Sequence, residues 1–96
     1  MRVKAVLVRY RYADTELRAR HRAEHVDRLR GLANDGLVLV AGPDVSDEGA
    51  VLVLLVPDVD AATAVMDADV YLQSGAVTSY TADAFVAVVT SPALSG

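Results

Sequence analysis

Three short segments of the sequence are apolar at every position, and they constrain the possible fold more than any other feature. They are LVLVA at 37–41, VLVLLV at 51–56 and FVAVV at 85–89. Their length and β-branched residues are typical of strands, but a strand with one face in water alternates apolar and polar side chains. We therefore expect a sheet in which both faces need a cover.

Helix and turn signals separate these strands. A first strand is predicted over 3–12, and Asp14 or Thr15 is placed to cap a helix that runs to about Asn34 and stops at Gly36. The remaining predictions are a strand over 37–43, a turn over 44–49, a strand over 50–56, a helix from Pro57 or Asp58 to about Asp69, a turn over 71–75, a strand over 76–89 with a bend or bulge near Ala82 and Asp83, and a loose tail over 91–96.

This β-α-β-β-α-β order is typical of the α+β ferredoxin-like fold with a four-stranded antiparallel sheet. We expect a single domain over residues 1–90. Two helices cover only one face of such a sheet, and the chain offers nothing else to cover the other. A homodimer that packs sheet against sheet, forming a dimeric α+β barrel, is the economical solution, since an exposed apolar face favours aggregation.

Composition narrows the classes of function. The 96 residues are 53% hydrophobic and 23% charged, which is typical of an ordered globular chain. A net charge of -4 argues against nucleic acid as a partner. The sequence has no cysteine, no signal peptide pattern at its start and no apolar run of membrane-spanning length. We therefore expect a soluble, cytoplasmic protein with no membrane association.

The segment HRAEH at 21–25 has the H-x-x-E-H pattern of some zinc peptidases. At about 100° per residue, however, His25 lies near the middle of the buried stripe of the helix, His21 lies at its edge and Glu24 points to solvent. The residues that define this stripe are Val26, Leu29, Leu32 and Ala33. A catalytic zinc site needs the glutamate in the site, so no metal is expected.

Helical phase also predicts a polar pocket beside His25. Arg18 and Arg22 lie on the same inward side, and Asp69 faces inward if the second helix continues that far, whereas Asp67 faces outward. A buried carboxylate is costly unless it is paired, and pairing with His25 would orient the imidazole as a general base. Phase alone leaves two alternatives open: a histidine that simply packs in the core, and an Asp69 in solvent at a helix end.

Four further residues are candidates for the pocket. Gly42 and Pro43 end a strand where backbone N–H groups could approach a ligand, although a plain turn explains them as well. Tyr71 and Ser74 could donate hydrogen bonds at the pocket mouth, or serve only in packing.

Two stretches carry a resemblance to a known family. RAEHVDRLRGLANDGLVLVAGP at 22–43 fits a pattern of R-x-x-H, spaced leucines, G-x-L and GP, and DADVYLQSGAV at 67–77 fits D-P-Y-x-x-x-G. The chain resembles the YCII-related (YciI-like) family over nearly its whole length. The resemblance implies a ferredoxin-like fold, a dimer related to muconolactone isomerase, and an active centre at His25 and Asp69. The chain departs from the family pattern at Val70, where members usually have proline.

The resemblance also implies a class of chemistry. A related dehydrochlorinase acts on chlorinated hydroxyhydroquinones, so we expect a lyase or isomerase, without cofactor, for a small cyclic or aromatic compound. In this hypothesis Arg22 or Arg18 holds an anionic substrate oxygen. The alternatives are a non-catalytic dimeric module that binds a small molecule, and an accessory domain that acts on a partner protein, for which the sequence shows no partner segment.

Overall fold

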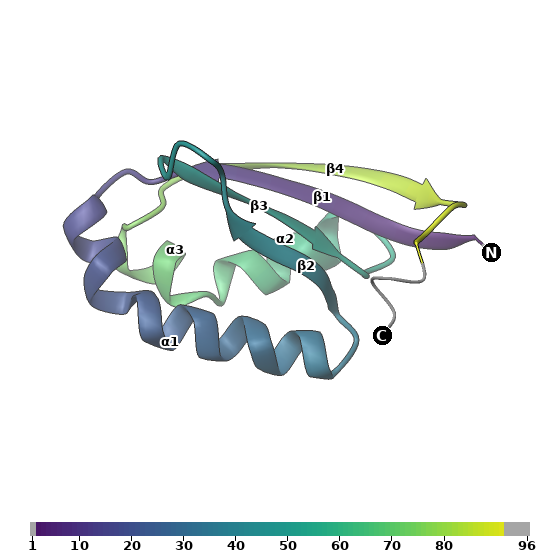
Figure 1. The fold of residues 1–96 in the computed structure, drawn as a ribbon, viewed down its shortest axis with the longest axis horizontal. Helices are drawn as coiled ribbons and strands as arrows, with labels where there is room; N and C mark the ends of the chain where they lie inside the picture. Colours follow the sequence, from purple (N-terminus) through teal and green to yellow (C-terminus); the bar gives the residue numbers. More distant parts are fainter. Residues whose placement is uncertain (1, 92–96) are drawn as a thin grey trace.

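The computed structural model describes residues 2–91 and shows an antiparallel sheet with every helix on one face (Figure 1). The order along the chain is β1 (Val3–Arg11), α1 (Thr15–Asn34), β2 (Val38–Pro43), β3 (Gly49–Leu54), α2 (Val59–Asp67), α3 (Val70–Ser74) and β4 (Tyr80–Ala87). The four strands lie in the order β2-β3-β1-β4. The predicted ferredoxin-like α+β fold is confirmed.

Helix α1 begins and ends where its sequence signals predict. The Asp14 carboxylate accepts a hydrogen bond of 2.9 Å from the Leu17 N–H and so caps the helix. Gly36 follows the last turn with φ 81°, a conformation that favours glycine. Within residues 2–91, neither α1 nor any other helix has the length and apolar character needed to cross a membrane.

The second helical region is divided in two. α2 is capped by Asp58, which accepts from the Ala61 N–H at 2.8 Å, but it ends at Asp67. Asp69 then adopts an extended conformation and caps α3, accepting from the Tyr71 N–H at 3.0 Å. The helix predicted to about Asp69 ends at Asp67, and the turn predicted over 71–75 is wrong. A short helix forms there instead, because a carboxylate that accepts from the next N–H groups starts a new helix.

The last strand is shorter and more regular than predicted. β4 covers Tyr80–Ala87 rather than 76–89, and its pairing with β1 is unbroken, so the predicted bulge near Ala82 and Asp83 is wrong. Asp83 needs no bulge because β4 is an edge strand, where a charged side chain is tolerated. The sheet irregularity lies instead in β2, between Val38 and Val40.

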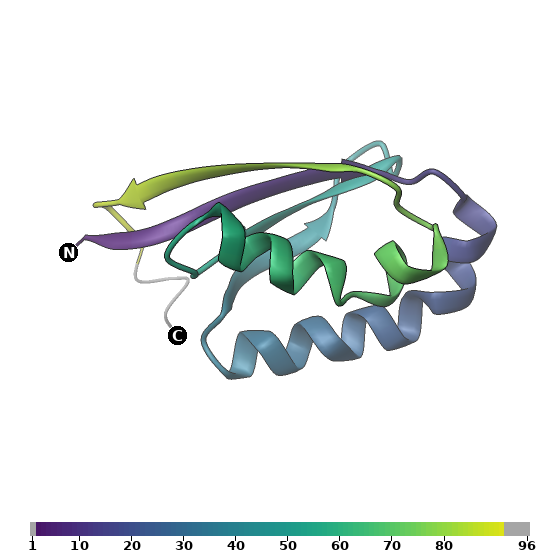
Figure 2. The ribbon, with the colours of Figure 1, turned by 180° about the vertical axis from the view of Figure 1, so that it is seen from behind.

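The hydrophobic core draws on the strands and on the helices, which all lie on one face of the sheet (Figure 2). It is built mainly from small aliphatic side chains, as expected of a sequence without tryptophan. The most deeply buried members include Val6, Val8, Leu52, Leu54, Ala62, Met66, Tyr71 and Val77. Inward and outward residues alternate along β1 and β3, which fixes the register of the central strands.

The helices lie on one face of the sheet, and no described segment covers the other face (Figures 1 and 2). This outer face carries Arg9 and Asp83 among mostly apolar side chains. Leu7 and Val53, which are paired across β1 and β3, lie on this face and are only half-buried. Val40 is 47% exposed and Phe85 is 44% exposed. These strands are thus apolar on both sides, as the sequence predicts, and the homodimer inferred from that pattern stays a prediction.

Candidate active site

His25 and Asp69 meet where α1 passes the start of α3. His25 Nδ1 lies 2.7 Å from Asp69 Oδ2, and the two side chains are 8% and 2% exposed. Helical phase predicts this contact, although Asp69 reaches it as the cap of α3 and not as part of the second helix. An ionised carboxylate only accepts hydrogen bonds, so Nδ1 donates to it, and in the neutral form of the ring Nε2 is the nitrogen without a proton.

Arg28 holds the other oxygen of the Asp69 carboxylate. Its Nη1 donates to Oδ1 at 3.0 Å, and its Nη2 donates to the Val65 carbonyl at 2.9 Å. Burial raises the pKa of Asp69, but hydrogen bonds from His25, from the Tyr71 N–H and from Arg28, together with the charge of His25, lower it below its ordinary value. Asp69 is therefore an anion at neutral pH, despite its burial.

The imidazole is fixed in its plane as well as in its direction. The His25 and Tyr71 rings are stacked, with centroids 3.8 Å apart and an interplanar angle of 8°. Tyr71 is held in turn by an edge contact with Tyr12, at 6.3 Å and 88°. His25 is thus oriented by a hydrogen bond at its edge and by a ring against its face.

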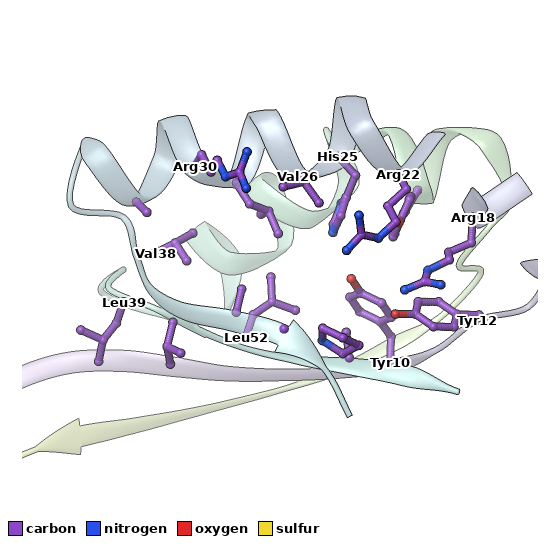
Figure 3. Close-up of a pocket in the computed structure, with 18 residues that line it drawn as sticks. Tyr10, Tyr12, Arg18, Arg22, His25, Val26, Arg30, Val38, Leu39 and Leu52 are labelled. Carbon is purple, nitrogen blue, oxygen red and sulfur yellow. The ribbon is translucent and has the colours of Figure 1, made fainter. Parts of the chain in front are cut away.

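A cavity of about 440 Å³ lies between α1 and the β2 side of the sheet (Figure 3). Six of the residues predicted from the sequence line it: Arg18, Arg22, His25, Gly42, Pro43 and Tyr71. Asp69 lies behind His25 and does not line the cavity. Gly42 pairs with Val51, so a Cβ added there would point to the outer face of the sheet, where it would meet nothing within 4 Å.

Ser74 departs from the prediction that placed it at the pocket mouth. It lies at the end of α3, where its hydroxyl donates to the Tyr71 carbonyl at 3.4 Å and accepts from the Ala76 N–H at 3.3 Å. These bonds satisfy backbone groups where α3 ends. Ser74 therefore supports the segment that carries Tyr71 without facing the cavity.

Arg18 gives the cavity a positive charge close to an aromatic ring. Its guanidinium carbon lies 4.5 Å from the centre of the Tyr12 ring, and its Nη2 lies 3.2 Å from Asp47 Oδ1. Its Nε is buried and has no hydrogen-bond partner within residues 2–91. Tyr12 and Asp47 thus hold the guanidinium in the wall of the cavity.

Tyr10 and Tyr12 line the same end of the cavity and were not among the sequence candidates. The sequence does contain a signal for them, because strict alternation of inward and outward residues from Val6 and Val8 places both tyrosines toward the helices. Burial raises the pKa of each of the Tyr10, Tyr12 and Tyr71 phenols, and for Tyr12 and Tyr71 the charge of Arg18 only partly opposes this effect. The phenols therefore remain protonated hydrogen-bond donors at neutral pH.

The HRAEH segment does not form a peptidase-like zinc site. Glu24 is exposed, as phase predicts, and His21 is half-buried and outside the cavity wall. His25 uses one ring nitrogen for Asp69. Across residues 2–91, no three histidine, aspartate or glutamate side chains converge.

Comparisons with known proteins agree with the fold. The sequence model of the YCII-related domain matches residues 2–85. Among curated proteins, none matches the chain. The structure resembles that of 5-chloro-2-hydroxyhydroquinone dehydrochlorinase from Burkholderia phenoliruptrix AC1100, solved in complex with 2,5-dihydroxybenzoquinone, with a TM-score of 0.69, 18% identity and coverage of 82% of this chain and 90% of that one. Because the family match spans nearly all of the sequence, the chain belongs to the YCII-related family.

Proposed function

We propose that the protein is a small lyase or isomerase in which His25 moves a proton and Asp69 orients it. The observation that carries the proposal is the hydrogen bond between His25 Nδ1 and the buried Asp69 carboxylate, beside a cavity that His25 lines. This bond leaves Nε2 as the basic nitrogen available to a molecule in the cavity. An imidazole held by a buried carboxylate is a common form of general base.

The proposed step balances without any other reactant. Nε2 takes a proton from the substrate, and the electron pair of the broken bond forms a new double bond. In an elimination the leaving group departs with its bonding electrons, and in an isomerisation the imidazolium returns the proton to another atom of the substrate. Asp69 stabilises the imidazolium in both cases, since its charge lies 2.7 Å from the ring.

The cavity also suits a substrate that becomes more negative when it loses a proton. Arg18 and Arg22 line the same cavity as His25 and bring two positive charges to it. The phenols of Tyr10, Tyr12 and Tyr71 are donors for a developing oxyanion. This combination favours quinols, phenols and lactones, whose deprotonated forms carry charge on oxygen.

The structural neighbour supports this class of chemistry. It is a dehydrochlorinase that was solved with a dihydroxybenzoquinone, and its fold covers most of this chain. We do not assign the substrate of that enzyme to the present protein. What supports the common class is a similar fold and the family match over residues 2–85, together with the contact between His25 and Asp69, the pair that the family resemblance implies.

The test is turnover of a panel of halogenated hydroquinols, phenols and lactones. We expect His25→Ala to lose product formation by roughly 10²- to 10⁴-fold, the usual contribution of a general base. His21→Ala is the matched control, because His21 lies one turn earlier on α1 and outside the cavity wall. Equal turnover by the wild type and His25→Ala would contradict the proposal. Tight binding by the wild type without turnover of any compound would instead assign the cavity to a non-catalytic binding module.

A further inference from the structure

We propose that the substrate is an anionic ring compound that carries an apolar substituent of several carbons. The proposal rests on the proposed function for the site at His25 and deepens it by naming the substrate class. It follows from the two chemically different ends of the cavity (Figure 3).

The polar end surrounds His25. Arg18 and Arg22 come from the first half of α1, and Tyr10 and Tyr12 come from β1 and the segment after it. Figure 3 shows these side chains grouped together with His25. The positive charges of Arg18 and Arg22 make this end the place for an anionic oxygen.

The apolar end lies farther along α1, between that helix and the start of β2. Its walls are Val26, Leu29 and Ala33 from α1, and Val38, Leu39 and Leu52 from the sheet, and the exposed residue Arg30 of α1 also lines the cavity at this end (Figure 3). Val26, Leu29 and Ala33 follow His25 on the side of the helix that turns toward β2. Figure 3 shows Val38 and Leu39 well away from the group formed by Arg18 and Tyr12. A polar ring bound at His25 leaves these side chains without a ligand contact.

The size of the cavity supports the same conclusion. About 440 Å³ falls within the range of roughly 300–1,000 Å³ typical of sites for drug-sized ligands. A single quinol ring is smaller than such a ligand and would fill only the polar end. Apart from Arg30, the side chains that line the unused volume are aliphatic, which favours a hydrocarbon substituent there.

Measurements of binding affinity test this proposal and do not require that the protein turns the probes over. The probes are 2,5-dihydroxybenzoquinone and its 3-propyl and 3-hexyl derivatives, titrated into the purified protein by isothermal calorimetry. Each fully buried methylene improves affinity by up to about fourfold. We therefore expect the hexyl probe to bind the wild type at least tenfold more tightly than the parent, with the propyl probe between them.

A larger side chain in the apolar end of the cavity should remove the preference for the hexyl probe over the parent. Ala33 is exposed on α1 and lines the cavity, so Ala33→Leu adds bulk there with little effect on folding. We expect Ala33→Leu to reduce the hexyl-to-parent affinity ratio to less than threefold. Ala23→Leu is the control, because Ala23 is an exposed residue of the same helix outside the cavity wall, and it should keep the wild-type ratio.

Arg18→Met tests the anionic end separately. It should weaken the parent and hexyl probes by the same factor, since both carry the same charged ring. Equal affinity of the parent and hexyl probes for the wild type, failure of both to bind, or equal ratios in Ala33→Leu and Ala23→Leu would each overturn the inference. Failure of the proposed catalysis would appear only in the turnover of His25→Ala and would leave the chain-length dependence intact.

Discussion

Asp69 holds a negative charge almost out of contact with solvent, and its neighbours make this possible. Hydrogen bonds reach its two oxygens from His25, from Arg28 and from the Tyr71 N–H. A buried carboxylate with all of these donors costs far less than an unpaired one. Its ionisation should therefore be linked to the stability of the fold.

We expect stability to fall at acid pH in a way that depends on Asp69. The folded-state pKa of Asp69 is lowered, so its contribution is complete above the unfolded carboxyl pKa of about 3.9 and is lost as pH falls through the folded value. Asp69→Asn should lower the melting temperature at neutral pH and flatten its dependence on pH below about 4. Asp27→Asn, an exposed change on α1, should leave the dependence unaltered. Identical pH curves for the wild type and Asp69→Asn would contradict this linkage.

Arg28 should stabilise the fold through its two hydrogen bonds. Arg28→Ala removes donors from Asp69 and from the Val65 carbonyl, and we expect a loss of about 1–3 kcal/mol in the free energy of unfolding, measured by urea titration. Arg28→Lys should recover only part of the loss, because an ammonium group lacks the fork that reaches both acceptors. Full recovery with lysine would show that charge alone matters.

The sequence predicts these residues to different degrees. Phase along α1 is enough to place His25 inward, because a short ring follows the direction of its Cα–Cβ bond. Arg28 lies at the edge of the same stripe, and a long flexible side chain there can turn to solvent or to the core. Its role depends on Asp69 and Val65, which are 41 and 37 residues away in the sequence. Local periodicity carries no information about such a contact.

The junction between α2 and α3 positions Asp69, and it is the element that the sequence predicts least well. Both helix starts have aspartate caps, but the period of the apolar residues continues across the break, so a single helix was expected. The ends of α1, by contrast, are marked by Asp14 and Gly36, whose roles are local. Capping residues thus predict the ends of α1 correctly, whereas the period of the apolar residues does not reveal the break between α2 and α3.

The same junction suggests a stabilising substitution. Val70 is the first residue of α3, a position that favours proline, and Asp69 before it has φ -76° and ψ 144°, which a following proline accepts. We expect Val70→Pro to raise the free energy of unfolding by about 0.4–1 kcal/mol, measured by urea titration. Leu72→Pro is the control, and it should destabilise because the Leu72 N–H donates to the Asp69 carbonyl. Destabilisation by Val70→Pro would show that the backbone at α3 does not tolerate the ring.

At the scale of the whole molecule, the outer face of the sheet remains to be explained. It presents Leu7, Val40, Val53 and Phe85 together, and the helices all lie on the opposite side (Figure 1). Single exposed apolar residues are ordinary, but a contiguous group on a flat surface favours association. In a single copy of the chain, these side chains therefore stay in contact with water.

We predict that the protein is a homodimer through this face. Light scattering at micromolar concentration should give twice the mass of the chain for the wild type. Val53→Lys, near the middle of the face, should give the monomer mass, because two lysines would meet in an apolar interface. Ala23→Lys adds the same charge on α1 and should leave the dimer unchanged. A monomer mass for the wild type would contradict the prediction.

The burial of Asp69 has a further consequence for proton transfer at His25. In the part of the chain that the structure describes, His25 is shielded on the side away from the cavity, since the Asp69 side chain is 2% exposed and the Tyr71 ring covers one face of the imidazole. In the proposed reaction, a proton accepted by Nε2 would leave through the cavity that the substrate itself occupies. Exchange with bulk water should be slow while a ligand fills the cavity, so in an isomerisation the ring would return to the substrate the same hydrogen that it removed. Such a site would work as a closed shuttle, in which an isotope label on the substrate is conserved and not washed out.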